Sequence, residues 1–173
     1  MAITYVAIAT TTVGAGGAAS IDFTSIPATY TDLILKTSIR TNQSAPDDYF
    51  KITLNGSSSN FTTRVIDGNG STAASYSYTT SPGSQIAGQA NGNTSTASTF
   101  ANSELYITNY AGSNNKSFSH DGVTENNATY ALAELGAHLW SNVAAITSIS
   151  IAPYYGTSFS QYSTATLYGI KNS

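Results

Sequence analysis

The sequence lacks cysteine and has few charged residues. With no Cys among 173 residues, no disulfide can hold the fold together. Charged residues make up 9% of the chain, where an average soluble domain has about 25%. Hydrophobic residues nevertheless reach 40%, which provides enough apolar surface for one folded domain of this length. The fold must therefore be stabilised by side-chain packing, by association of subunits, or by both.

Cationic residues are scarcer than acidic ones, and the formal net charge is -3. No two of the cations are adjacent in the chain; they are Lys36, Arg40, Lys51, Arg64, Lys116 and Lys171. A site that binds nucleic acid needs several clustered cations to neutralise phosphates. The sequence therefore predicts no nucleic-acid partner.

Long apolar runs are also absent. No stretch approaches the roughly 20 apolar residues that cross a bilayer, so we expect no membrane partner. Residues 1–10 begin directly with an alternating pattern and carry no basic region, so they do not form a signal peptide. The abundant Ser, Thr and Asn side chains supply solubility through neutral hydrogen-bonding groups, with few charges for salt to screen. We expect a protein that is made in the cytoplasm and either stays there or leaves by lysis.

Alternation of apolar and polar residues dominates what is present. The clearest case is 31–40, where Leu33, Leu35 and Ile39 share one face. Turn signals such as Asn55-Gly56 recur about every eight to twelve residues, the spacing of a sandwich. The sequence predicts an all-β, single-domain antiparallel β-sandwich of jelly-roll type over residues 1–173. The residues expected to face inward are Phe23, Leu33, Leu35, Ile39, Phe50, Ile52, Leu54, Leu105, Ile107, Ile149 and Ile151.

Two segments are less regular. Residues 68–100 are poor in large apolar side chains, and we expect long polar loops there with two weak strands, near Tyr76–Tyr78 and Gln85–Ala87. Residues 128–140 fit both helical spacing and alternation. Gly136 in their middle weakens a helix by about 1 kcal/mol, which favours a strand.

One short helical turn is expected near residues 141–146. The predicted strands leave many unpaired edges, and closed packing of several copies is the simplest way to cover them. A surface with little charge also makes subunit contact inexpensive in desolvation. We therefore expect a homo-oligomer, with a trimer as the first choice.

Two motifs partly match nucleotide-binding or calcium-binding patterns, but each lacks a feature that such a site requires. Gly14–Ala19 fits the G-x-G-x-x-A fingerprint, but a β pattern follows it where a helix is required. Asp67–Gly70 contains acids and amides of a calcium-loop kind, yet calcium needs six to eight oxygens, so a tight turn is the better interpretation. The remaining acids of interest are interpreted as solvated; they are Asp47, Asp48, Asp121 and Glu125.

The two histidines, His120 and His138, do not form a recognisable catalytic pattern either. A hydrolytic triad would place one of them beside an activated serine, and the nucleophile elbow G-x-S-x-G is absent. His120 is followed by Asp121, and neighbours in a strand point to opposite faces. The sequence therefore predicts no enzyme, no catalytic residue, no cofactor and no metal.

Aromatic residues are the best candidates for binding. Tyr76 and Tyr78 share one face of a polar strand, and Tyr154-Tyr155 follow a strand end. Tyrosine beside amides and acids suits carbohydrate, because the ring covers the apolar face of a sugar and polar groups meet its hydroxyls. Packing in a core or subunit interface uses the same residues equally well. Trp140 joins the candidate ligand or interface aromatics, with core packing favoured over a ligand platform.

Four segments carry a resemblance that spans the chain: Ala18–Leu33, Ile107–Ser113, Ala145–Ile149 and Ser163–Ile170. They resemble a family of small structural proteins of tailed phages, many of them from aquatic bacteria. The family has no catalytic residues to transfer. The resemblance implies a virion part with a jelly-roll-like sandwich, usually oligomeric.

The expected function follows from this resemblance. The chain begins and ends with a strand and shows no shaft repeat, coiled coil or adaptor, so we expect a capsid decoration (cement) protein on the virion exterior. Its partners would be further copies of itself and the major capsid protein. The alternative is a receptor-binding tail fibre or head fibre, joined to an attachment protein and recognising host surface glycans through its loops. A polysaccharide-cutting enzyme ranks third, because its paired carboxylates are not evident among scattered acids.

Overall fold

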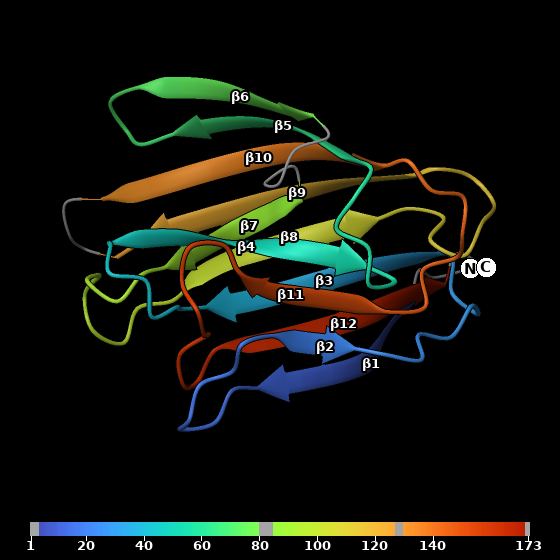
Figure 1. The fold of residues 1–173 in the computed structure, drawn as a ribbon, viewed down its shortest axis with the longest axis horizontal. Coiled ribbons are helices and arrows are strands. Elements are labelled where there is room, and N and C mark those ends of the chain that lie inside the picture. The colour runs from blue at the N-terminus through green and yellow to red at the C-terminus, as the bar shows by residue number, and fades with distance from the viewer. Residues whose placement is uncertain (1–3, 80–84, 127–129, 172–173) are drawn as a thin grey trace.

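Two antiparallel sheets make up the protein (Figure 1). The computed structural model describes residues 4–79, 85–126 and 130–171, and these ranges contain strands and no helix. The large sheet contains, in spatial order, β1 (Thr4–Thr12), β12 (Thr164–Lys171), β3 (Asp32–Ile39), β8 (Ala101–Ile107), β9 (Lys116–Glu125), β10 (Ala131–Trp140), β5 (Phe61–Gly68) and β6 (Ala73–Thr79). The small sheet contains β2 (Ile21–Phe23), β11 (Ile149–Pro153), β4 (Asp47–Leu54) and β7 (Ile86–Asn91). The predicted all-β sandwich is confirmed, and its jelly-roll type stays a prediction.

The small sheet lies over the middle of the large one, and the hydrophobic core fills the space between them (Figure 1). Alternation decides which side chains enter that core, because successive residues of a strand point to opposite faces. β4 and β9 show this strictly, with every second residue buried. All of the predicted inward residues are buried, which confirms the predicted core. β5 and β6 extend past the edge of the small sheet (Figure 1), and the inward Tyr76 of β6 is 45% exposed.

Most of the segment 128–140, whose sequence fits both a helix and a strand, forms strand β10. Its residues from 131 onward alternate between the two faces, with Leu132, Glu134, Gly136, His138 and Trp140 directed inward. Residues 128 and 129 of that segment lie outside the described residues. Pairing with β9 on one side and β5 on the other satisfies the backbone of β10, so the sheet overrides the helical spacing of its leucines.

The helical turn predicted near 141–146 is wrong. Residues 141–148 form an irregular connection whose backbone groups bind elsewhere. The amide of Ala144 donates to Asn142 Oδ1 at 2.8 Å, and the amide of Ile146 donates to the carbonyl of Tyr110 at 2.9 Å. Asn55 adds contacts to this connection from the β4–β5 turn, including a bond to the carbonyl of Ala145. Asparagine side chains thus replace the bonds that a helical turn would need.

The long polar loops predicted for residues 68–100 are only partly present. The second of the two weak strands is β7, which is buried over its whole length between β4 and the large sheet. Its small residues explain both the weak sequence signal and the burial. A Cβ atom added at Gly88 would lie within 2.5 Å of the Phe50 ring, so only glycine lets this strand approach the core closely. Residues 80–84 of the segment lie outside the described residues.

Candidate functional site

Five tyrosines gather around a cavity of about 220 Å³ where β5 and β6 extend past the small sheet. We call it the tyrosine pocket; its lining residues are Tyr49, Val65, Asp67, Tyr76, Tyr78, Ile86, Glu134, Tyr154 and Tyr155. Four of the five aromatics singled out in the sequence meet here, although they come from segments about 75 residues apart. Tyr49 and Glu134 also line the pocket and were not singled out, and Asp67 lines it although the sequence placed it in a tight turn.

The β6 tyrosines are placed by strand register. Tyr76 pairs with Val65 and Tyr78 with Thr63, and both β5 partners are buried on the inner face. Directly opposed residues of an antiparallel pair share a face, so the two rings point to the same side as the core. The rings stack with centroids 6.3 Å apart and planes 19° from parallel. Tyr76 is still 45% exposed, because the small sheet ends before it reaches β6.

The other tyrosine pair is held in place by Asp48. This carboxylate accepts hydrogen bonds from the amides of Tyr155 at 3.1 Å and Gly156 at 3.0 Å, and from the Thr41 hydroxyl at 2.9 Å. Its interpretation as a solvated acid is wrong, since Asp48 is completely buried. Burying a carboxylate is unfavourable unless several hydrogen-bond donors surround it, and the turn after β11 supplies two of these donors. Asp48 therefore fixes the backbone that carries Tyr155 beside the pocket.

Two carboxylates reach the pocket from neighbouring strands. Glu134 of β10 lies directly opposite Asp67 of β5, so both side chains point to the inner face. Burial, together with the nearby charge of Glu134, raises the pKa of Asp67 above its usual value. The sequence interpretation of the acids as scattered is wrong for this pair. The sequence did contain one sign of this pair: the charged Glu134 lies on the same strand face as the apolar Leu132 and Trp140.

Behind the pocket, a row of hydrogen-bonded side chains runs through the core. We call it the polar chain: Thr63, His138, His120, Glu134 and Gln89, all buried. Thr63 Oγ1 lies 2.9 Å from His138 Nδ1, and His138 Nε2 lies 2.6 Å from His120 Nδ1. His120 Nε2 then lies 2.5 Å from Glu134 Oε1, and Gln89 Nε2 donates to Glu134 Oε2 at 2.8 Å. Both oxygens of the Glu134 carboxylate are therefore occupied.

The polar chain has the residue types of a catalytic relay, but its members are buried away from the surface. Burial, followed by the charge of His120, lowers the pKa of His138 to about 3, so its imidazole is neutral near pH 7. The hydrogen bonds join Thr63, both imidazole rings and Glu134 in one continuous row. Thr63 is completely buried, so its hydroxyl cannot meet a substrate. The geometry supports an internal structural network, a role that neither histidine was given from sequence.

Trp140 lies apart from the tyrosine pocket. It is 1% exposed, and its ring stacks on Phe61 at a centroid distance of 6.1 Å. The rejected motifs also have plain structural roles. Strand β2 and not a helix follows Gly14–Ala19, and Asp67–Gly70 lies at the turn between β5 and β6. In that turn the side chain of Asn69 accepts from the amide of Thr72 at 2.8 Å.

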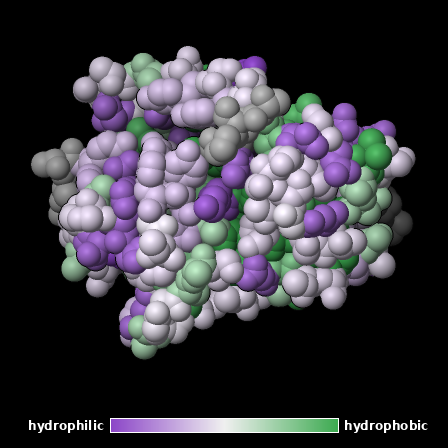
Figure 2. Space-filling view, viewed as in Figure 1, coloured by the Kyte–Doolittle hydropathy of each residue, from purple (hydrophilic) through white to green (hydrophobic). Residues whose placement is uncertain are grey.

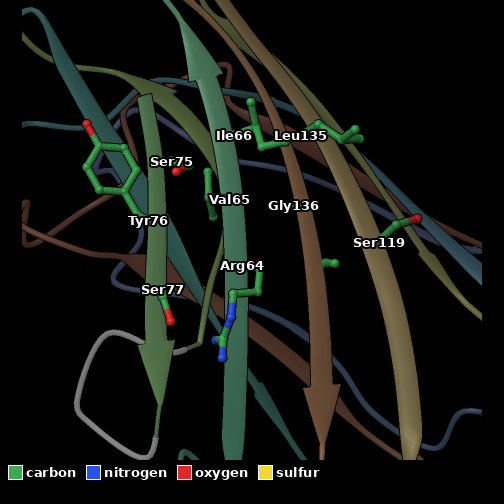
Figure 3. Close-up of a pocket in the computed structure, with 10 residues that line it drawn as sticks. Arg64, Val65, Ile66, Ser75, Tyr76, Ser77, Ser119, Leu135 and Gly136 are labelled. Carbon is green, nitrogen blue, oxygen red and sulfur yellow. The ribbon is translucent and has the colours of Figure 1, made fainter. Parts of the chain in front are cut away.

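The outer face of the large sheet carries an uncovered apolar surface (Figure 3). Ile66 and Leu135 lie side by side across the β5–β10 pair and are 62% and 59% exposed. With Val123, Ala133 and Ala137 they form what we call the apolar band. A shallow groove of about 460 Å³ is lined by Ile66, Leu135 and Ala137 of this band and, on its β6 side, by residues 75–77. In Figure 3 Tyr76 projects from β6 away from Ile66 and Leu135.

Charges flank the apolar band on both sides. Arg64 lies on β5, and exposed Asp121 lies on β9, on the other side of β10.

The opposite face of the molecule differs from this one. Over the small sheet the surface is mostly pale or purple, and hydrophobic residues appear only as scattered spots (Figure 2). The apolar band is thus a local feature of the outer sheet face.

Comparison with known proteins gives no match to a family model, a curated protein or a solved structure. Among the described residues, no three His, Cys, Asp or Glu side chains converge in a way that could hold a metal ion. Within the same ranges, no helix has the length and apolar character required to span a membrane.

Proposed function

We propose that the protein is a non-enzymatic structural part of a tailed-phage particle, a capsid decoration (cement) protein on the outer shell. The apolar band carries this proposal. Large exposed aliphatic side chains on an open sheet face, in a chain with only 9% charged residues, mark a contact surface. Covering them is favourable at roughly 25 cal/mol per Å² of apolar area, and few charges must be desolvated. The phage context comes from the four segments that resemble structural proteins of tailed phages.

The occupant of the apolar band is another copy of the same chain, in a homotrimer. Rotation about an axis parallel to the strands brings the β9 flank of one copy against the β5 flank of the next. Asp121 on the first flank and Arg64 on the second then meet with opposite charge. A face with complementary flanks closes into a ring, as symmetric oligomers require.

Stabilisation of the particle then follows from mass action. Each trimer binds across joints between coat subunits and only when those subunits are assembled. A ligand that binds the assembled state alone raises the stability of that state with its own concentration. No bond is made or broken, which agrees with a Glu134 carboxylate whose oxygens both bind inside the protein.

The trimer is tested by light scattering of the purified chain. We expect a particle of three times 18.0 kDa for the unaltered protein. Leu135→Asp places a charge in the centre of the contact, and we expect it to give monomers. Val143→Asp is the matched control, because Val143 is also 59% exposed but lies in the connection between β10 and β11. A monomeric unaltered protein, or a trimer that tolerates Leu135→Asp, contradicts this contact.

A receptor-binding tail fibre or head fibre is the second candidate, and the tyrosine pocket is the observation in its favour. Such a fibre recognises host glycans and is present in few copies, whereas a decoration protein covers the shell. Quantitative mass spectrometry of purified particles separates the two. Hundreds of copies per particle support decoration, and a few dozen or fewer support a fibre.

A further inference from the structure

We propose that the tyrosine pocket binds one neutral sugar unit, at the end or along the length of a larger glycan. The inference holds for a capsid position and for a fibre position alike, since it rests on the pocket alone. It also does not require the trimer, because strand register places Tyr76 and Glu134 on the inner face of the large sheet and Leu135 on its outer face.

The apolar part of the site consists of ring faces set at different angles. Tyr154 and Tyr155 meet edge to face, with centroids 4.6 Å apart and planes 89° apart. Tyr49 lies 6.5 Å from Tyr155 at an interplanar angle of 59°. The Tyr155 side chain is 61% exposed although its backbone is held firmly. Leaving so much apolar area uncovered is unfavourable for the free protein. The C–H face of a pyranose ring is the kind of surface that such rings cover.

The polar part of the site accepts hydrogen bonds. Asp67 presents a carboxylate and the tyrosines add hydroxyl groups. Glu134, whose two oxygens bind His120 and Gln89, contributes mainly its negative charge. Burial raises the pKa values of Tyr49 and Tyr78, so their hydroxyls keep their protons and can both donate and accept. Sugar hydroxyls need this mixture of acceptors and donors in one cavity.

The charge of the site selects the class of sugar. The two carboxylic acids in the lining are Asp67 and Glu134, and no Lys, Arg or His is among the described residues that line the pocket. A bound carboxylate, sulfate or phosphate would face Asp67 and Glu134 without a cation to offset the repulsion. The site therefore suits neutral hexoses and N-acetylhexosamines and disfavours sialic and uronic acids.

The size of the cavity limits the ligand to one residue of a glycan. At about 220 Å³ it is smaller than the roughly 300–1,000 Å³ of pockets that enclose drug-sized ligands. A ligand of about a dozen heavy atoms binds weakly, and we expect a Kd on the order of 1 mM for a monosaccharide. Several copies in one assembly would convert this into useful avidity.

The lining is held before any ligand arrives. Asp48 fixes the turn that carries Tyr155, and the polar chain fixes Glu134 through His120 and Gln89. A pocket whose groups are ordered in advance loses less entropy on binding. Asp48 and His120 are therefore positioning residues, and neither needs to touch the sugar.

The test is a titration of the isotope-labelled protein followed by amide NMR signals. The probes are glucose, galactose, mannose and N-acetylglucosamine, with sialic acid and glucuronic acid as charged counterparts. We expect at least one neutral sugar to shift the amide signals of Tyr155, Gly156 and Tyr76, with half-saturation on the order of 1 mM. The acids should bind at least tenfold more weakly.

Variants connect the signal to the pocket. Tyr155→Ala and Tyr76→Ala remove exposed rings, and each should weaken binding about tenfold or more while the protein stays folded. Tyr5→Ala is the matched control, because Tyr5 is 55% exposed on β1 at the far edge of the large sheet. Tyr5→Ala should bind like the unaltered protein.

Four results would overturn the inference. They are no shift with any neutral sugar, unchanged binding by both pocket variants, equal binding of the acidic sugars, and release of new reducing ends from an oligosaccharide. The last result would assign hydrolysis to Asp67 and Glu134 in place of simple binding. None of them bears on the trimer, which light scattering tests separately.

Discussion

His138 sits in the centre of the molecule between an aromatic ring and two polar partners. The Phe118 ring stacks on it at a centroid distance of 4.5 Å with planes 8° apart, and Thr63 and His120 hold its two nitrogens. His138 is 3% exposed, so bulk solvent does not surround a charged imidazole at this position. Burial and the adjacent His120 accordingly lower the pKa of His138 to about 3.

This pKa makes the stability of the fold depend on pH. In the unfolded chain a histidine has a pKa of about 6.5, so between that pH and about 3 the unfolded state binds a proton that the folded state refuses. The contribution of His138 is complete above pH 6.5 and is lost as pH falls towards 3. We expect a loss of up to about 4 kcal/mol in the free energy of unfolding over this range.

Urea unfolding at a series of pH values between 7 and 4 measures the loss. His138→Gln keeps a polar side chain of similar length, and its unfolding free energy should change less steeply with pH, whatever its absolute stability. Equal slopes in the two proteins would show that other groups cause the pH dependence.

At the scale of elements, β10 is the strand on which the site depends. Its inner face carries Glu134 to the tyrosine pocket and His138 to the polar chain, and its outer face carries Leu135 to the apolar band. Gly136 lies between them, opposite His120 of β9. A Cβ atom added there would overlap the His120 ring, so glycine is what allows the two histidines to approach each other.

Gly136→Ala should therefore destabilise the protein by about 1–3 kcal/mol, although alanine is the better strand residue in an open site. Gly14→Ala is the control, because no atom lies within 4 Å of an added Cβ atom and its backbone is not left-handed. We expect this variant to change stability by less than about 0.5 kcal/mol. Thermal unfolding of the two variants side by side provides the comparison, and an equal effect would contradict the packing argument.

At the scale of the whole molecule, the two sheet faces have different tasks in the proposed assembly. The outer face of the large sheet packs against other copies, and the face around the small sheet stays free with the tyrosine pocket at its border. The pairing of Arg64 with Asp121 of the next copy makes this arrangement testable by charge exchange.

Arg64→Glu alone or Asp121→Arg alone should weaken the trimer roughly fivefold at each contact, because like charges then meet at the rim. The double exchange should restore most of the loss, since opposite charges face each other again. Dilution followed by mass measurement gives the dissociation of each variant. Additive weakening in the double variant would contradict contact between these two residues.

Local features of the fold follow from short stretches of sequence. Alternation assigned inner and outer faces, as in Leu33, Leu35 and Ile39, because the period of a strand is fixed by the backbone within each segment. Asn55-Gly56 marked a turn for the same local reason, and both residues adopt positive φ. Prediction from sequence failed where side chains of Asn142 and Asn55 take over backbone bonds in residues 141–148.

Which strands become neighbours depends on contacts between distant segments. The opposition of Glu134 to Asp67, the contact of His120 with His138, and the meeting of two distant tyrosine pairs all depend on register between segments far apart in the chain. Register is chosen by the free energy of the whole core and not by any single strand. Each strand could therefore be predicted from its own segment. The tyrosine pocket, the polar chain and the apolar band depend on how the strands pair in the two sheets.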